Sequence, residues 1–118
     1  MGFKNSATLT ARLLTDPVFT PFKDGSGEWV RVRVIFWNSG PKPGLTSLVS
    51  SSPGVVEKFR SLALTKGCMI EARGELDFSE WSDRQGNGRS EVRIRVLDIE
   101  LEARPTIATR TTKPATSR

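Results

Sequence analysis

The 118-residue sequence contains no histidine and only one cysteine, and these two absences exclude many common kinds of protein site. A single cysteine cannot form an internal disulfide. Without histidine there is no imidazole base, no thiolate–imidazole pair and no zinc site built from the usual ligands. Cys68, which is followed by Met69 and Ile70, is expected to be a buried apolar residue. We therefore predict a protein with no metal and no other cofactor.

Long apolar runs are also missing. No segment approaches the ~20 apolar residues that are needed to cross a bilayer. The first five residues, MGFKN, lack the apolar stretch of a signal peptide. These features predict a cytoplasmic protein with no membrane partner, and the chain length predicts one domain.

Catalytic patterns are absent as well. No serine lies in a nucleophile-elbow context, and the glycine-rich runs DGSG and QGNG lack the Lys-Ser/Thr of a phosphate loop. Both runs are typical of hairpin turns instead. The acidic residues between positions 71 and 83 are scattered along predicted strand and loop, where solvated carboxylates are ordinary. The sequence therefore predicts that the protein is not an enzyme.

Positive charge is present, but it is unevenly distributed. The formal net charge is +5, and four of the 18 Lys and Arg residues lie in residues 103–118, which hold no acid. The rest of the chain carries 14 basic against 13 acidic residues and is almost neutral. A net positive charge suggests an anionic partner. A binding surface on the body must therefore come from local segregation of charge on the faces of strands.

Alternating apolar residues predict the first two strands. The first covers residues 7–14, with its odd-numbered residues inward, and Asp16-Pro17 ends it. After a turn at residues 24–27, the segment EWVRVRVIFWN alternates again. Its inward face carries Val30, Val32, Val34 and Phe36. Its outward face carries Trp29, Arg31, Arg33, Ile35 and Trp37, which is unusual for a merely solvated surface.

The spacing of apolar residues then changes from alternation to a helical period over one segment and returns to alternation afterwards. A loop at residues 38–44 and a third strand at 45–51 precede residues 52–67, whose apolar residues recur at helical spacing with Pro53 in the first turn. Phe59 lies on the apolar stripe of this helix and is assigned to the core. Strands follow at 68–81, with Gly74 as a bulge or kink, and at 90–102. The last strand is expected to point Val92, Ile94 and Val96 inward before its phase slips near Leu97.

Five short strands with one helix between the third and fourth is the element order of the OB-fold, a small Greek-key barrel. We predict an all-β protein with this fold over residues 1–103. Residues 104–118 are rich in Thr, Ala, Pro, Arg and Ser and cannot bury a core. They are predicted to form a disordered basic tail.

Cations and flat aromatic rings occur together on the predicted strands, which is what binding of unpaired nucleic acid requires. Other interpretations stay open for three residues: Trp29 is also consistent with a cap on the barrel end, and Arg93 and Arg95 with pairing to Glu91 or Glu71. The predicted stacking residues are Trp37, Phe78 and Trp81. The predicted phosphate-binding residues are Lys4, Arg31, Arg33, Arg84, Arg89, Arg93 and Arg95.

Two blocks of sequence resemble the bacterial single-stranded-DNA-binding (SSB) proteins. NSATLTARLLTDP, residues 5–17, resembles their first strand. TKGCMIEARGELDFSEWSDRQGNGR, residues 65–89, is similar to their Lys-Gly…Gly-x-Leu…Trp-Thr/Ser-Asp…Gly signature with matched spacing. The resemblance covers about residues 5–102 and is looser between the two blocks. It implies an OB-fold and a homo-oligomer, usually a homotetramer, with a dimer as the alternative.

The resemblance also assigns residues. The family's stacking tryptophan before the long hairpin loop matches Trp81, and its N-terminal DNA-contacting segment corresponds to Lys4, Asn5 and Ser6. Two other family platforms are missing. Ser47 stands in place of a stacking tryptophan, and Pro53 stands in place of the aromatic residue that opens the helix.

Further departures affect the partners. The family glycine of the first strand is Ala11, and Ser79 and Glu80 replace basic residues before Trp81. The chain ends in KPATSR instead of the acidic, Phe-tipped peptide through which the family recruits replication and repair enzymes. These departures predict weaker binding or a shifted path of the DNA that uses Trp37 and Phe78. They leave recruitment of such enzymes undecided.

The expected function is sequence-independent binding of single-stranded DNA, which protects unpaired strands in replication, recombination and repair and places the protein at the nucleoid. The first alternative is an OB-fold protein-interaction subunit, such as a primosome or conjugation accessory factor, with weak DNA binding. The second alternative is an RNA binder of the same fold.

Overall fold

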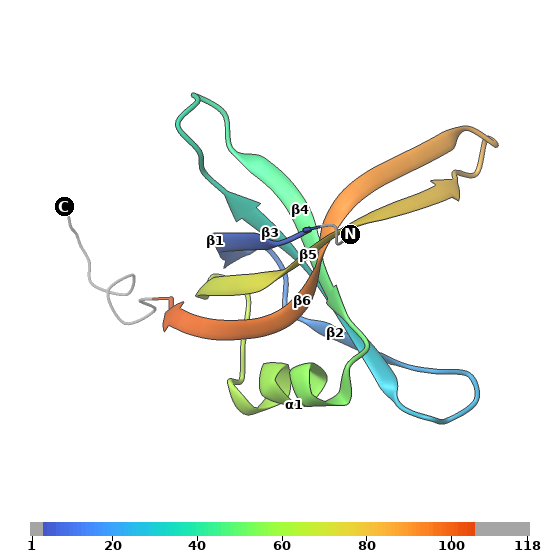
Figure 1. Cartoon of the computed structure of the whole chain (residues 1–118), viewed down its shortest axis with the longest axis horizontal. Helices are drawn as coiled ribbons and strands as arrows, with labels where there is room; N and C mark the ends of the chain where they lie inside the picture. Colours follow the sequence, from blue (N-terminus) through green and yellow to red (C-terminus); the bar gives the residue numbers. More distant parts are fainter. Residues whose placement is uncertain (1–3, 106–118) are drawn as a thin grey trace.

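The computed structural model describes residues 4–105, which form a closed β-barrel with one helix at its end (Figure 1). The sheet order is β1-β5-β6-β4-β3-β2, and an additional pairing of β1 with β3 closes the barrel. β4 and β6 run parallel and all other neighbours are antiparallel. The predicted OB-fold is confirmed. The elements are β1 (Ala7–Leu13), β2 (Val18–Pro21), β3 (Glu28–Phe36), β4 (Gly44–Ser50), α1 (Pro53–Ser61), β5 (Met69–Ser82) and β6 (Gly88–Ala103).

The first barrel strand is bent into two segments, β1 and β2, and the sequence predicted only the first. Both segments pair with β3, and the Leu14 backbone N–H donates to the Arg33 carbonyl (2.8 Å) just before the bend. Asp16-Pro17 signals the end of a strand, which is correct locally. The chain nevertheless stays beside β3 after the bend, so that six segments make five barrel strands.

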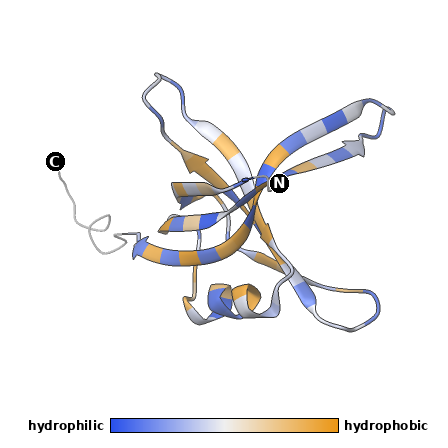
Figure 2. Cartoon of the chain, in the orientation of Figure 1, coloured by the Kyte–Doolittle hydropathy of each residue, from blue (hydrophilic) through white to orange (hydrophobic). Residues whose placement is uncertain are grey.

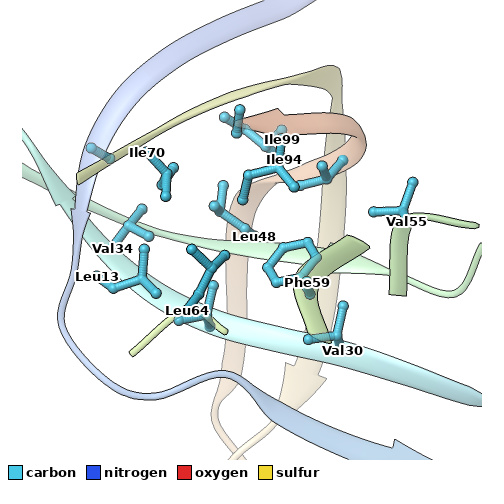
Figure 3. Packing of buried hydrophobic residues seen from close by; sticks show 14 of the residues in the cluster. Leu13, Val30, Val34, Leu48, Val55, Phe59, Leu64, Ile70, Ile94 and Ile99 are labelled. Atoms are coloured by element: carbon cyan, nitrogen blue, oxygen red, sulfur yellow. The ribbon is translucent and has the colours of Figure 1, made fainter. Parts of the chain in front are cut away.

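The barrel interior is filled by a cluster of apolar residues (Figure 3), of which Leu13, Val30, Val34 and Ile94 were among those assigned to it from the sequence. Phe59 of α1 is 1% exposed and closes one end of the barrel, and Cys68 is completely buried. Both assignments are confirmed. Burial of each large apolar side chain contributes about 1.5–3 kcal/mol, so this cluster is the main source of stability. The labelled members are Leu13, Val30, Val34, Leu48, Val55, Phe59, Leu64, Ile70, Ile94 and Ile99.

The helix is shorter than the predicted span of residues 52–67. α1 ends at Ser61, and Ala63 adopts a left-handed conformation (φ 52°). The guanidinium group of Arg104 donates to the carbonyl oxygens of Leu62 (2.7 Å) and Ala63 (3.1 Å). A cation at a helix C-terminus satisfies carbonyl groups that lack intrahelical partners. The end of β6 is thereby fastened to the end of the helix.

A bulge lies in β6 at Leu97, where the sequence predicted a phase slip, and Gly74 of β5 lies opposite it. The β5–β6 register shifts there, because Arg73 pairs with Asp98 whereas Gly74 pairs with Val96, which leaves Leu97 as the extra residue. A Cβ atom on Gly74 would lie 2.0 Å from the carbonyl oxygen of Arg95, so only glycine fits. A bulge bends a strand and increases its twist. Beyond it, β5 and β6 leave the barrel as a paired arm (Figure 1).

We call residues 77–93 the hairpin arm. Its ladder is regular from Gly74↔Val96 to Ser82↔Gly88, so the connecting loop is confined to residues 83–87 and is shorter than predicted. The prediction that Val92 points into the core is wrong, because Val92 is 52% exposed. The alternation that buries Ile94 and Val96 continues along β6, but the arm extends past the barrel and no second layer covers Val92.

Among residues 4–105, no helix is long and apolar enough to span a membrane. The predicted tail falls largely on residues 106–118, which lie outside the described residues.

Candidate nucleic-acid interface

Four arginines gather on one outer surface of the barrel, which we call the arginine face. Arg31 and Arg33 come from β3, and Arg93 and Arg95 come from β6. β4 lies between these two strands. The sequence placed the two pairs on separate strand faces, and the sheet order joins them into one surface.

Small side chains of β4 form the floor between the two arginine pairs. Ser47 pairs with Arg33, and Val49 pairs with both Arg31 and Arg95. Ser47 is completely buried and Val49 is 7% exposed, although both point outward from the barrel. Ser47, which replaces a stacking tryptophan of the resembled family, therefore leaves room that the arginine side chains cover.

Carboxylates hold three of the four guanidinium groups. Arg93 Nε donates to Asp77 Oδ2 (2.9 Å), and Arg95 Nη2 donates to Asp77 Oδ1 (2.9 Å). Glu91 pairs with Arg33. The pKa of Asp77 is lowered by its hydrogen bonds to Arg95 and Arg93. A phosphate group must therefore compete with carboxylates for these cations.

The alternative that Arg93 and Arg95 pair across the sheet is thus observed, with different partners from those considered. Glu91, one expected partner, holds Arg33 instead. Glu71, the other, pairs with Arg73 at 2.9 Å. The choice depends on the β5–β6 register, which places Asp77 opposite Arg93.

Arg31 differs from the other three arginines. Its side chain is exposed, and it forms no ion pair with any residue in the range 4–105. It lines a hollow of about 320 Å³ together with Ser79, Trp81, Glu91 and Arg93. Trp81 is 48% exposed, so part of its indole ring is accessible beside Arg31, which has no ion pair among residues 4–105. This combination suits a stacked base with an adjacent phosphate.

The tip of the hairpin arm is ordered by Asp83. Its carboxylate accepts from the backbone N–H groups of Gln85 and Asn87 (both 2.9 Å) and from Arg89 Nε (3.0 Å). The pKa of Asp83 is lowered, and the largest cause is its hydrogen bond from the backbone N–H of Asn87. Trp81 is directly opposite Arg89 in the ladder, so the ring stands on regular strand and not in a loop. Arg84 is exposed in the turn.

Phe78 lies on the opposite side of the arm from Trp81. The two residues are three positions apart on a regular strand, and alternate residues of a strand point to opposite faces. Phe78 is 59% exposed and is joined by Leu76 and Val92, which are also exposed. We call these three residues the apolar patch. Figure 2 shows hydrophobic and hydrophilic residues alternating along this part of β6.

The remaining predicted site residues lie at other positions. Trp37 follows directly after β3 in the β3–β4 connection and is 58% exposed. Lys4 is exposed and precedes Asn5, whose amide group donates to the Leu76 carbonyl and accepts from its backbone N–H (both 2.9 Å). Lys4 therefore sits near the base of the arm. The structure brings Trp81 and the four arginines together, and it separates Phe78 from them.

Two aromatic residues absent from the predicted site also lie beside the arginine face. Trp29 of β3 and Phe22 of the β2–β3 turn are half-buried and line a pocket of about 360 Å³. Its other lining residues are Val49, Ser50, Ser51, Asp77, Arg93 and Arg95. Trp29 could have been found from its alternation with Arg31, whereas nothing in the sequence indicated Phe22.

Within the described part of the chain, no group of three or more acidic or cysteine side chains could hold a metal ion.

Comparison with solved structures identifies the fold. The chain superposes on an SSB from Plasmodium falciparum, solved in complex with single-stranded DNA, with a TM-score of 0.70, 17% identity and coverage of 86% of this chain and 99% of that chain. A small single-stranded DNA-binding protein from Streptomyces coelicolor gives a TM-score of 0.64, 16% identity and coverage of 85% and 96%. No family model and no curated protein matches the sequence. The chain thus shares its fold, over most of its length, with single-stranded-DNA-binding proteins.

Proposed function

We propose that this chain binds single-stranded DNA without reading its sequence. The observation that carries the proposal is the hollow in which the exposed ring of Trp81 lies beside Arg31 and Arg93. Stacking on an aromatic ring tolerates every base, and guanidinium groups bind phosphates that are the same at every position. The fold shared with a protein solved in complex with single-stranded DNA supports the same conclusion.

In this proposal the DNA strand lies along the arginine face and reaches the hairpin arm at Trp81. Arg84 and Arg89 at the arm tip extend the cationic path. Phe78, Trp37 and Lys4 contact only a strand that continues beyond this face. The protein has no chemistry of its own and keeps strands unpaired during replication, recombination and repair. It acts at the nucleoid as a homo-oligomer, and the basic tail adds unspecific attraction to DNA.

A specific observation favours a second candidate, an OB-fold protein-interaction subunit. Three of the four arginines on the arginine face form ion pairs with Asp77 or Glu91, and the apolar patch is exposed. This candidate predicts weak or undetectable DNA binding by a protein that forms a tight complex with another chain.

Titration with unlabelled oligothymidine, followed by tryptophan fluorescence at two salt concentrations, distinguishes the two candidates. DNA binding predicts quenching, and an affinity that falls with salt by a slope of about −0.7 per phosphate contact. Undetectable binding at low salt would overturn the proposal and favour the interaction subunit. A parallel titration with oligouridine tests the RNA alternative, because the 2′-hydroxyl is where proteins distinguish RNA from DNA.

A further inference from the structure

We propose that Trp29 and Phe22 form a second base-stacking site, at the opposite end of the arginine face from Trp81. This inference rests on the proposed binding of single-stranded DNA and extends it. Its ligand is an unpaired nucleobase of the same strand, with its phosphate at Arg95. The sequence-based prediction did not include this site, and a cap on the barrel end was one interpretation of Trp29.

The local fold positions both rings on the outside of the barrel. Trp29 is paired with Thr20 of β2 and shares the outward face of β3 with Arg31. The backbone of Phe22 closes the β2–β3 hairpin, since its N–H donates to the Gly27 carbonyl (2.8 Å) and its carbonyl accepts from the Gly25 N–H (3.0 Å). The ring of Phe22 lies over Gly27, where an added Cβ atom would be 3.8 Å from it.

The volume and the lining residues of the pocket suit a nucleobase. Its volume of about 360 Å³ lies within the range of ~300–1,000 Å³ that is usual for ligand sites. Apolar surface comes from Trp29, Phe22 and Val49, and hydrogen-bonding groups come from Ser50 and Ser51. An aromatic ring beside serine hydroxyls can hold a base by its face and accept any of the four bases.

Charge completes the site. Arg95 is exposed at the pocket, and its partners among residues 4–105 are two carboxylates, Asp77 at 2.9 Å and Glu75 at 3.6 Å. Exposed ion pairs contribute little stability, so a phosphate group can replace a carboxylate on this guanidinium without a large cost. A base in the pocket therefore has a cation available for its phosphate.

The pocket is connected with the Trp81 hollow. Arg93 lines both, from the β6 strand that runs between them. A further hollow along β3 shares Trp29 with the pocket and Arg31 with the Trp81 hollow. One DNA strand can thus stack a base on Trp29, pass over Arg93 and stack another base on Trp81. The two ends of the arginine face act as one extended site.

The test uses full-length proteins with one tryptophan each, in which the other two tryptophans are replaced by phenylalanine. The variant W37F/W81F retains only Trp29, and W29F/W37F retains only Trp81. Oligothymidine is expected to quench both. Labelled oligothymidine anisotropy measures binding independently of the tryptophans. Binding with quenching at Trp81 alone would overturn this inference while the proposed function stands. No binding by the parent protein would overturn the proposed function itself.

Affinity measurements separate stacking from packing at Trp29. Trp29→Leu keeps an apolar side chain in the pocket but removes the π face, whereas Trp29→Phe keeps a ring. Trp29→Leu is expected to weaken binding roughly 5- to 150-fold, and Trp29→Phe much less, because base stacking is worth about that factor per ring. Equal affinities of Trp29→Leu and the parent, with both proteins folded by thermal melt, would contradict a stacking role.

Discussion

Asp77 and Arg93 face each other across the β5–β6 ladder, and Arg93 Nε donates to Asp77 Oδ2 at 2.9 Å. The other oxygen of the same carboxylate accepts from Arg95. One acid thus holds two of the four cations on the arginine face. The number of free guanidinium groups that a bound DNA strand encounters therefore depends on whether its phosphates displace Asp77.

Asp77→Asn is expected to tighten binding of oligothymidine at low salt, because it frees Arg93 and leaves Arg95 with only the longer contact to Glu75 at 3.6 Å. The salt slope should become steeper by about 0.7 for each new phosphate contact. Asp98→Asn is the matched control: it changes the net charge equally, but Asp98 pairs with Lys58 and Arg73 instead. Equal effects of the two substitutions would show that only net charge matters.

Trp81→Ala is expected to weaken binding by about 1–3 kcal/mol for every oligonucleotide sequence tested, because a stacking platform for one base is lost. Phe78→Ala is the comparison on the other side of the arm. It should leave the affinity for short strands unchanged and weaken only long strands that can wrap around the arm. Fluorescence anisotropy with labelled oligothymidines of two lengths measures both. A loss confined to one base sequence would contradict stacking without sequence readout.

Arg31 and Arg33 lie two residues apart on the same face of β3, but their substitutions are expected to have different effects. Arg31→Ala removes a cation without an ion pair among the described residues, so it should reduce the salt slope by about 0.7 and leave the unfolding midpoint unchanged. Arg33 Nη1 donates to Ser47 Oγ (2.9 Å) and pairs with Glu91. Arg33→Ala should therefore lower the unfolding midpoint. The reverse pattern in urea denaturation and salt titrations would refute this division.

Gly74→Ala is expected to destabilise the protein by about 1–3 kcal/mol, the usual cost of overpacking. The new Cβ atom would lie 2.0 Å from the Arg95 carbonyl oxygen, a backbone atom that cannot move without breaking the bulge. Gly88→Ala is the control, since nothing lies within 4 Å of a Cβ atom there. Urea denaturation of both variants measures the difference, and equal stabilities would show that the bulge can open.

Asp98 predicts a pH dependence of stability. Its hydrogen bonds to Lys58 and Arg73 lower its pKa from 3.8 to about 2. A carboxyl group whose pKa is depressed in the folded state stabilises the fold above its unfolded pKa, and this contribution is lost as the pH falls. Asp98→Asn should therefore destabilise the protein at neutral pH, with a difference that disappears between pH 3.8 and about 2. Urea midpoints at several pH values test this, and a constant difference would argue against it.

The alternation of residues determined much of the fold before any coordinates. Val30, Val32 and Val34 had to share one side of β3, and a barrel strand must turn its apolar side inward. The change to helical period located α1 and the burial of Phe59. The end of the helix and the segment β2 were missed, because Arg104 and β3 stabilise them from positions distant in the sequence.

The same alternation contained part of the site. The odd spacing between Phe78 and Trp81 requires opposite faces on a regular strand, so the sequence already contained their separation. The sequence also showed which arginines alternate outward on β3 and on β6.

What only the tertiary structure decided is which strands are neighbours. Local sequence sets the direction of each side chain within its own strand, because that depends on backbone geometry alone. It does not set the register or the order of strands, since these depend on long-range pairing. The pairing of β4 with β3 and, in parallel, with β6 places Arg31 and Arg95 on either side of Val49. The β5–β6 register places Asp77 opposite Arg93. The arginine face exists because of these pairings.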